Sequence, residues 1–374
     1  MKSAIKVGTL IGIPIEVNYS WMIIFGLVTW SLAVGYYPVF NPMLPEVQYW
    51  MAALVSSILL FISLLLHELS HSYIAMRNSI TIKKITLFIF GGVAQMEKEP
   101  DTSKVEFKIA IAGPLCSLMI AAVSFGFKNI FSFPLFNPLV ASVFGYLAIV
   151  NTGIVVFNSI PGFPLDGGRV LRAVLWRLNN NLRASTKIAA FSGKVFSFIL
   201  MFLGLFFLIL RDFVSGIWFL VLGLFLHEAA ELSYQQLILK RALVGVPVSD
   251  VMASDLVTVP PDLKLDRLVN DYFFKHRHVG FPVVDGGNLK GMVMIQNLKN
   301  TPKDEWCKKT VSEVMVAVRE DLLIPPDTDS LEALLQVTKT GLGRLLVVEN
   351  GKLLGLVTQR NLMKLFEIKA NLYI

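Results

Sequence analysis

Six long apolar segments dominate the first 235 residues of this 374-residue chain. A membrane-spanning helix needs about 20 mainly apolar residues. We place six candidates at about 19–38, 49–75, 107–127, 138–158, 195–211 and 213–233. Only 27 of those 235 residues are charged, about 11% against roughly 25% in a soluble domain. The other 139 residues carry 34 charges, which predicts a membrane-embedded part followed by a soluble part and excludes a single globular domain.

The positive charges of the apolar part are sorted by side. Fourteen Lys and Arg residues lie in the N-terminus and the connections 76–108 and 159–194, whereas the opposite connections hold only Lys128 and Arg211. The positive-inside rule therefore predicts cytoplasmic termini and a cytoplasmic soluble part, in a multi-pass protein of the plasma or inner membrane. Since +5 of the net charge of +7 lies in the apolar part, the charge gives no indication of nucleic-acid binding.

Residues 81–96 form an unusual connection, because they are rich in strand-forming residues and too short to span a membrane. One interpretation is a strand pair around Ile85–Val93 at membrane depth, which requires burial in protein or a cavity lining. The other is an amphipathic loop on the membrane surface. The pattern favours neither.

The second apolar segment ends in the pattern H-E-x-x-H, with His67, Glu68 and His71. Residues four apart share a helix face, so both imidazoles can bind one Zn²⁺ while Glu68 serves as a general base for the attacking water. The pattern can arise by chance. However, ionisable groups in an apolar span cost a few kcal/mol each unless they are paired or metal-bound, which favours a catalytic zinc site.

A catalytic zinc takes three protein ligands and keeps one open position. The fourth span is followed by Asn158-Ser-Ile-Pro-Gly-Phe-Pro-Leu-Asp166-Gly-Gly. The second and fourth spans run in the same direction, so Asp166 lies at the depth of the histidine pair and is our candidate for the third ligand. The alternative for Asp166 is a turn residue before Gly-Gly. His227 is followed by Glu231 four residues later. We interpret both as polar residues at the point where the sixth span leaves the membrane, and not as metal ligands.

H-E-x-x-H in an early span, followed by N-x-x-P-x-x-x-L-D-G after a later one, resembles the site-2 protease family of intramembrane zinc metalloproteases. The resemblance covers about residues 1–235. It implies one Zn²⁺ per chain held by His67, His71 and Asp166, with Glu68 as the catalytic base. It also implies that Asn158 orients the substrate carbonyl or stabilises the oxyanion, and that the segment around Gly91-Gly92 clamps an unwound substrate.

The soluble part contains an internal repeat of about 64 residues. Val248-Ser-Asp-Val-Met recurs as Val311-Ser-Glu-Val-Met, and Phe281-Pro-Val-Val-Asp is matched by Leu345-Leu-Val-Val-Glu. Two copies at one period indicate a duplicated module. Each copy has the pattern strand, helix, strand, strand, helix.

This repeat resembles a tandem pair of cystathionine-β-synthase (CBS) domains, which implies regulation by an adenosine nucleotide and a homodimer formed through the CBS domains. The ribose-binding pattern of that family is Thr or Ser followed three residues later by Asp. The second copy has Thr358 and Asn361, and the first has Met294 and Asn297. The pattern is therefore degraded, and a purely structural or dimerising pair remains an equal alternative.

The predicted fold is thus a polytopic α-helical membrane protein with six spans, a small membrane-associated β segment and a soluble α/β CBS pair. We expect a metalloprotease domain over 1–235, a linker over 236–245, and CBS copies at about 246–305 and 309–370 within 246–374. The expected function is zinc-dependent cleavage of a transmembrane protein substrate in the lipid bilayer, regulated by the CBS pair. The alternatives are a CBS-regulated metal or ion transporter and an inactive scaffold.

Overall fold

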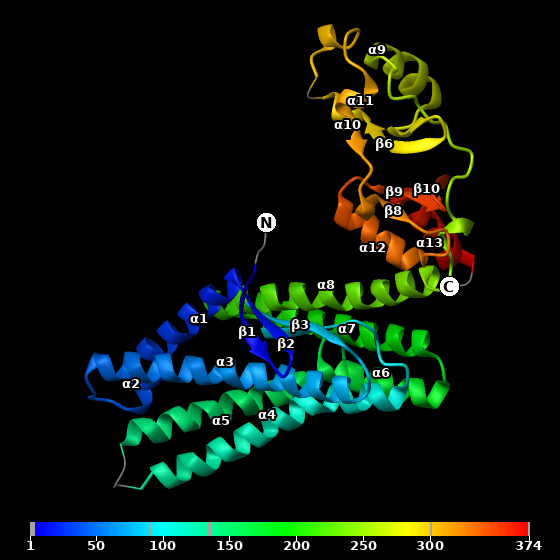
Figure 1. Cartoon of the computed structure of the whole chain (residues 1–374). Coiled ribbons are helices and arrows are strands. Elements are labelled where there is room, and N and C mark those ends of the chain that lie inside the picture. Colours follow the sequence, from blue (N-terminus) through cyan, green and yellow to red (C-terminus); the bar gives the residue numbers. More distant parts are fainter. Residues whose placement is uncertain (1–3, 90, 134–136, 300, 373–374) are drawn as a thin grey trace. The chain divides into compact units, whose positions relative to one another are not determined.

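The chain folds into two compact units, Met1–Tyr234 and Gln235–Ile374 (Figure 1). The computed structural model describes residues 4–89, 91–133, 137–299 and 301–372. Each unit has its own hydrophobic core.

Six helices of the described chain are long and apolar enough to cross a membrane, as the sequence predicts. The first span, Tyr19–Phe40, combines α1 (Tyr19–Ser31), a π-helical turn (Leu32–Tyr36) and α2 (Tyr37–Phe40). The other five are α3 (Glu46–Arg77), α4 (Ser103–Phe131), α5 (Pro138–Asn158), α7 (Leu182–Ile209) and α8 (Phe213–Leu243).

The fifth helix differs from the sequence expectation. It begins at Leu182, thirteen residues before the predicted start at 195, because Asn181 caps its N-terminus through a bond from the Ala184 amide. Hydropathy alone missed this basic first part of α7. The same connection holds α6 (Asp166–Asn179), an additional amphipathic helix. Helix α8 runs through residues 236–243 of the segment expected to be a linker.

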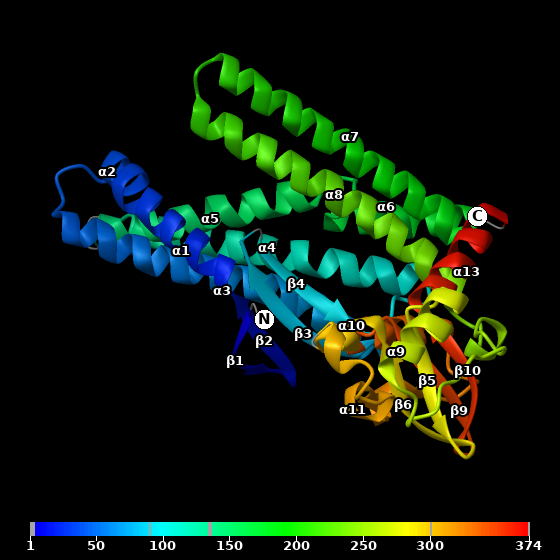
Figure 2. The ribbon, with the colours of Figure 1, turned by 90° about the horizontal axis from the view of Figure 1, so that it is seen from above.

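A four-stranded sheet lies against the helices of the first unit, as the views from the side and from above show (Figures 1 and 2). Its order is β1-β2-β3-β4, with β1 (Ala4–Leu10), β2 (Ile13–Asn18), β3 (Ile82–Phe88) and β4 (Gly91–Met96). Of the two interpretations of residues 81–96, the structure therefore shows the strand pair, as the antiparallel β3–β4 hairpin. The sequence analysis missed the N-terminal β1–β2 hairpin, which joins β3 through a parallel pairing.

Polar side chains buried on α3 connect it to the neighbouring spans. Ser57 Oγ accepts a 2.9 Å bond from Thr29 of α1, and Ser63 Oγ accepts a 3.3 Å bond from Asn151 of α5. Small and polar residues are common at helix interfaces in membranes, where apolar burial gives little drive for association. These bonds fix the alignment of α3 with α1 and α5.

The second unit contains the two copies of the sequence repeat. The second copy follows the predicted order, with β8 (Leu323–Ile324), α12 (Ser330–Thr340), β9 (Arg344–Glu349), β10 (Lys352–Thr358) and α13 (Gln359–Leu372). The first copy holds α9 (Leu265–Arg267), a π-helical turn (Leu268–Phe274), β5 (Gly280–Asp285), β6 (Asn288–Met294) and α10 (Ile295–Leu298).

The first copy departs from the predicted pattern at its leading strand, which is reduced to a single parallel bridge between Val259 and Val283. The second copy begins with two short elements, α11 (Val311–Val314) and β7 (Val316–Ala317), and β7 pairs with β6 of the first copy. Each copy has its own apolar core, and Met292, Met294 and Leu346 form a third cluster between the copies.

Candidate active site

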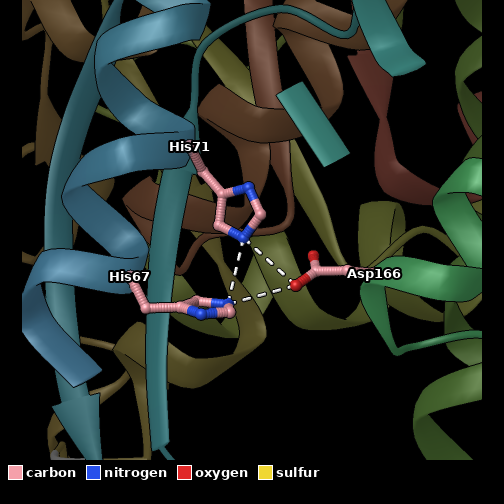
Figure 3. A group of neighbouring side chains, drawn as sticks. All are labelled: His67, His71 and Asp166. Carbon is pink, nitrogen blue, oxygen red and sulfur yellow. Dashed lines mark hydrogen bonds and ion pairs between the residues drawn. The ribbon is translucent and has the colours of Figure 1, made fainter. Parts of the chain in front are cut away.

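Three ligand-type side chains from α3 and α6 converge inside the first unit (Figure 3). The Nε2 atoms of His67 and His71 lie 3.2 Å apart, and each lies 3.1 Å from Oδ2 of Asp166. All three residues are buried. The structure therefore brings together the three residues that the sequence analysis combined, including Asp166, which lies 95 positions beyond His71.

Helix α4 orients both imidazole rings. His71 Nδ1 lies 2.6 Å from the carbonyl oxygen of Ile109, and His67 Nδ1 lies 2.9 Å from Ser117 Oγ. Because a carbonyl can only accept, His71 Nδ1 carries the hydrogen, and a neutral His71 presents a lone pair at Nε2. In metal sites, a hydrogen bond at the ring nitrogen that does not bind the metal commonly fixes the orientation of a histidine ligand. The sequence analysis missed Ser117 and Ile109, because a serine and a main-chain carbonyl in an apolar helix carry no distinctive signal.

The donor set fits a zinc ion. Two imidazole nitrogens and a carboxylate oxygen are typical zinc ligands, and donors about 2.0–2.1 Å from a tetrahedral ion lie roughly 3.3 Å apart. The separations of 3.1–3.2 Å are close to this value. Lone pairs and a carboxylate that face one another in a buried place repel unless a cation or a proton lies between them.

A missing side chain on α4 provides the space for this cluster. A Cβ atom on Gly113 would lie 2.2 Å from His71 Nε2 and 2.5 Å from His67 Nε2. Any residue other than glycine would therefore push the imidazoles out of place. Gly113, which lies between Ala112 and Pro114, therefore has a specific function in this site.

The loop between α5 and α6 delivers Asp166 by close backbone packing against α7. A Cβ on Gly193 would lie 1.9 Å from the carbonyl oxygen of Phe163, and a Cβ on Gly162 would lie 2.6 Å from Gly193 Cα. The Phe163 amide donates to the carbonyl of Ala189 at 3.0 Å. The loop is therefore fixed on α7, and Asp166 emerges from it in the first turn of α6.

A buried ion pair connects α6 to α4. Arg172 Nε donates to Glu106 Oε1 at 2.6 Å, and the Arg172 guanidinium lies 5.0 Å from the centre of the Phe163 ring. Glu106 is fully buried and Arg172 is 7% exposed. Removal of one partner of such a pair typically costs about 3–5 kcal/mol, because the other charge is left buried alone. The pair therefore links the helix that orients the histidines to the helix that carries Asp166.

The cluster opens into a cavity of about 800 Å³. Glu68, Asn158 and Arg169 line it together with strand β4. Strand β4 lies against Glu68, since a Cβ on Gly92 would lie 2.5 Å from Glu68 Cγ. Within the described part of the chain, the Asn158 carboxamide has no hydrogen-bond partner, so its donors are available to a molecule in the cavity.

The other sequence candidates lie elsewhere. His227 Nδ1 lies 3.3 Å from Ser197 Oγ, and His227 is not part of the ligand cluster. Thr358 and Asn361 belong to the second unit, where Thr358 hydrogen-bonds to the Asn361 side chain. Arg169 was recognised in the sequence only as a basic residue of a connection. Its place in the cavity follows from its spacing of three from Asp166 on one helix.

Comparison with known proteins identifies both parts of the chain. The model of peptidase family M50 matches residues 55–134 and 130–203, and the CBS-domain model matches residues 248–302 and 311–368. The zinc metalloprotease MJ0392 of Methanocaldococcus jannaschii is 34% identical over 380 aligned residues, which cover 100% of this chain and 99% of that protein. The chain belongs to peptidase family M50.

One further relative agrees with this assignment, and one solved structure is similar to part of the chain. The zinc metalloprotease Rip3 of Mycobacterium tuberculosis is 32% identical over 379 aligned residues, covering 98% of this chain and 94% of that protein. The solved structure of a site-2 protease from Methanocaldococcus jannaschii is 33% identical, covers 62% of this chain and 95% of that one, and superposes with a TM-score of 0.43.

Membership of family M50 confirms the main sequence predictions. The chain is a multi-pass membrane protein and a zinc metalloprotease of the site-2 type, with a tandem CBS pair. The alternative of a CBS-regulated metal or ion transporter is not favoured, because the relatives that match the whole chain are zinc metalloproteases.

We predict that Gly113→Ala abolishes zinc binding, because the added methyl group overlaps both Nε2 atoms. The measurement is zinc content of the purified full chain by mass spectrometry, together with its thermal unfolding. The expected result is less than about one tenth of the zinc content of the wild type.

Gly126→Ala is the matched control, because Gly126 lies on the same helix with no atom within 4 Å of its added Cβ. It should keep full zinc content, and it should be slightly more stable, since alanine favours a helix over glycine by up to about 1 kcal/mol. Normal zinc content in Gly113→Ala would contradict the role assigned to this glycine.

Proposed function

We propose that His67, His71 and Asp166 hold the catalytic zinc of an intramembrane endopeptidase. The observation that carries this proposal is the buried triangle of their ligand atoms, with edges of 3.1–3.2 Å. Among the described residues, these three form the one group of three or more His, Cys, Asp or Glu side chains that could hold a metal ion. When bound, Zn²⁺ supplies Lewis-acid polarisation of the scissile carbonyl and of the attacking water.

Glu68 and Asn158 perform the acid–base and electrostatic steps in this proposal. The Glu68 carboxylate accepts the proton of the attacking water and returns it to the nitrogen of the leaving amine. Asn158 Nδ2 donates to the carbonyl oxygen as negative charge develops there. Both side chains line the cavity beside the ligand cluster, and Gly92 of β4 packs closely against Glu68.

Strand β4 binds the substrate in an extended conformation. It is an edge strand of the sheet, paired only with β3, and residues Gly91–Ala94 line the cavity. A transmembrane helix hides its peptide bonds in internal hydrogen bonds, so it must unwind before water can attack. Addition of the unwound segment to β4 satisfies its backbone groups at the moment they are freed.

We propose the same domain boundaries that the sequence predicts. The protease part is 1–235, a connecting segment is 236–245, and the CBS pair is 246–374. The pair regulates the protease and forms a homodimer.

We predict that Glu68→Gln retains zinc and loses cleavage of a transmembrane model peptide. General acid–base catalysis contributes about 10²–10⁴-fold, so the rate should fall at least 100-fold. Zinc content and peptide cleavage are measured on the same reconstituted full-length sample.

Glu46→Gln removes an exposed carboxylate from the same helix and should cleave like the wild type. If Glu68→Gln cleaved at the wild-type rate, the proposed mechanism would be wrong. Loss of zinc in this variant would instead assign Glu68 to the metal site.

We propose that both termini and the CBS pair lie in the cytoplasm. A membrane-impermeant maleimide should label the exposed Cys307 only after cells are opened, in a Cys116→Ala background. Asp212→Cys, in the short connection between α7 and α8, should be labelled in intact cells. The reverse labelling pattern would overturn this orientation.

We propose that an adenosine nucleotide binds in the second unit, in a cavity of about 730 Å³ lined by both CBS copies. Thr358 Oγ1 donates to Asn361 Oδ1, which leaves the Asn361 amide hydrogens free for a ribose hydroxyl. Arg344 also lines this cavity. Arg344 is half-buried, and burial lowers the pKa of its guanidinium. Its Nη1 donates to the Gly280 carbonyl at 3.3 Å, whereas its Nε has no partner among the described residues. A half-buried guanidinium with a free donor favours an anionic ligand such as a nucleotide phosphate.

We predict that calorimetry with AMP and ATP detects binding to the full chain. Arg344→Gln should weaken this binding about tenfold or more, because a hydrogen bond to a charged group contributes about 1.5–3 kcal/mol. Arg319→Gln, at an exposed pair with Asp321, is the matched control and should bind normally. No heat at millimolar nucleotide would contradict the proposal and leave a structural role for the pair.

Two equivalent helical segments support the homodimer. Phe274 follows α9 in the first copy and is 71% exposed, and Leu335 on α12 in the second copy is 57% exposed. Large exposed apolar side chains commonly mark contact surfaces. Light scattering of the detergent-solubilised chain should give the mass of two chains, and Phe274→Asp with Leu335→Asp should give that of one. A monomeric wild type would refute the dimer.

A further inference from the structure

A second large groove lies on α3 and α4, and it is separate from the catalytic cavity. Its volume is about 730 Å³, and Leu66, Tyr73, Lys108, Ala112, Leu115 and Met119 are among the residues that line it. The catalytic cavity uses a different face of α3, which carries His67, Glu68 and His71. Ile11, at the turn between β1 and β2, also lines the groove, and both views show this hairpin beside α3 (Figures 1 and 2).

The groove is polar at one end and apolar at the other. Helices α3 and α4 pack against each other, and Tyr73 and Lys108 mark one end of the groove. Arg77 lies 5.2 Å above the Tyr73 ring at this end. Within the described part of the chain, neither Lys108 nor Arg77 has an ion-pair partner. The other end is formed by Leu66, Leu115 and Met119. The groove therefore combines one cation in its lining, Lys108, and a second beside it, Arg77, with an apolar channel.

The length of the groove fits one leaflet of a bilayer. Lys108 and Met119 are eleven residues apart on α4. At 1.5 Å per residue this is about 16 Å, close to half of the roughly 30 Å hydrocarbon core. An acyl chain that starts from a headgroup at Lys108 would therefore end near the bilayer centre at Met119.

We propose that this groove binds one anionic phospholipid, with its phosphate at Lys108 and Arg77 and an acyl chain along Leu66, Leu115 and Met119. The positive charge at this end of the groove favours an anionic lipid headgroup over a transmembrane helix of a substrate. The inference rests on the proposed orientation, in which this end of the groove faces the cytoplasm. Transmembrane helices carry their own Lys and Arg at that side, and these would be repelled by Lys108 and Arg77.

The bound lipid would lie against the back of the metal site. Ala112 in the groove precedes Gly113, and Leu66 and Leu69 flank His67 on α3. The lipid therefore stabilises the packing of the two helices that hold and orient the histidines. An anionic lipid should raise the temperature at which the zinc-loaded protein unfolds.

The test is a titration of the purified full chain in detergent with phosphatidylglycerol and with phosphatidylcholine of identical acyl chains. Native mass spectrometry measures retained lipid, and thermal unfolding measures stabilisation. We expect one retained phosphatidylglycerol per chain with a higher unfolding temperature, and weaker binding of phosphatidylcholine. Each basic residue near a membrane surface contributes a factor of about five to binding of anionic lipid, so Lys108→Gln should weaken phosphatidylglycerol binding by about that factor.

Lys128→Gln, at the opposite end of α4, is the matched control and should leave binding unchanged. Leu115→Trp should fill the apolar channel and weaken binding of both lipids. The proposal is overturned if the two lipids bind equally, if Lys108→Gln binds like the wild type, or if Leu115→Trp has no effect. Displacement of phosphatidylglycerol by a transmembrane peptide with basic ends would also overturn it and identify a peptide site. Maleimide labelling tests the orientation separately.

Discussion

The structure of the first unit depends on one electrostatic constraint: two imidazoles and a carboxylate must lie together in a buried place. Each is expensive to bury in an apolar span, and the three ligand atoms lie only 3.1–3.2 Å apart. A divalent cation among them turns mutual repulsion into attraction. In the proposed zinc site, the energy needed to assemble the cluster would become affinity for the ion.

The rest of the membrane unit can be understood as support for that cluster. Helix α4 gives one ring partner to each histidine and leaves space at Gly113. The Glu106–Arg172 pair connects α4 to α6, and the loop before Asp166 packs on α7 at Gly193. The β4 strand then lines the remaining side of the cavity. The site is therefore supported by four elements that are distant in sequence: α4, α6, α7 and β4. We expect small changes in their packing to alter zinc affinity.

Much of this could be predicted from the sequence, and the limits have physical causes. Apolar length identified six spans, and spacing plus shared direction brought His67, His71 and Asp166 together. The start of α7 was missed because its first turns are basic, and the β1–β2 hairpin because its pairing with β3 is non-local. Ser117, Ile109 and Gly113 act through one hydroxyl, one carbonyl and one absent side chain, so their residue types alone carry no signal. The Glu106–Arg172 pair joins residues 66 positions apart.

X-ray absorption spectroscopy at the zinc edge, on the purified and active full chain, would show which atoms bind the metal. We expect one zinc per chain with nitrogen and oxygen ligands only, at about 2.0–2.1 Å, including two imidazoles. We also expect Asp166→Ala to change this first coordination shell. A sulfur ligand at about 2.3 Å, which would implicate a cysteine, or full cleavage by zinc-free protein would contradict the proposed zinc site.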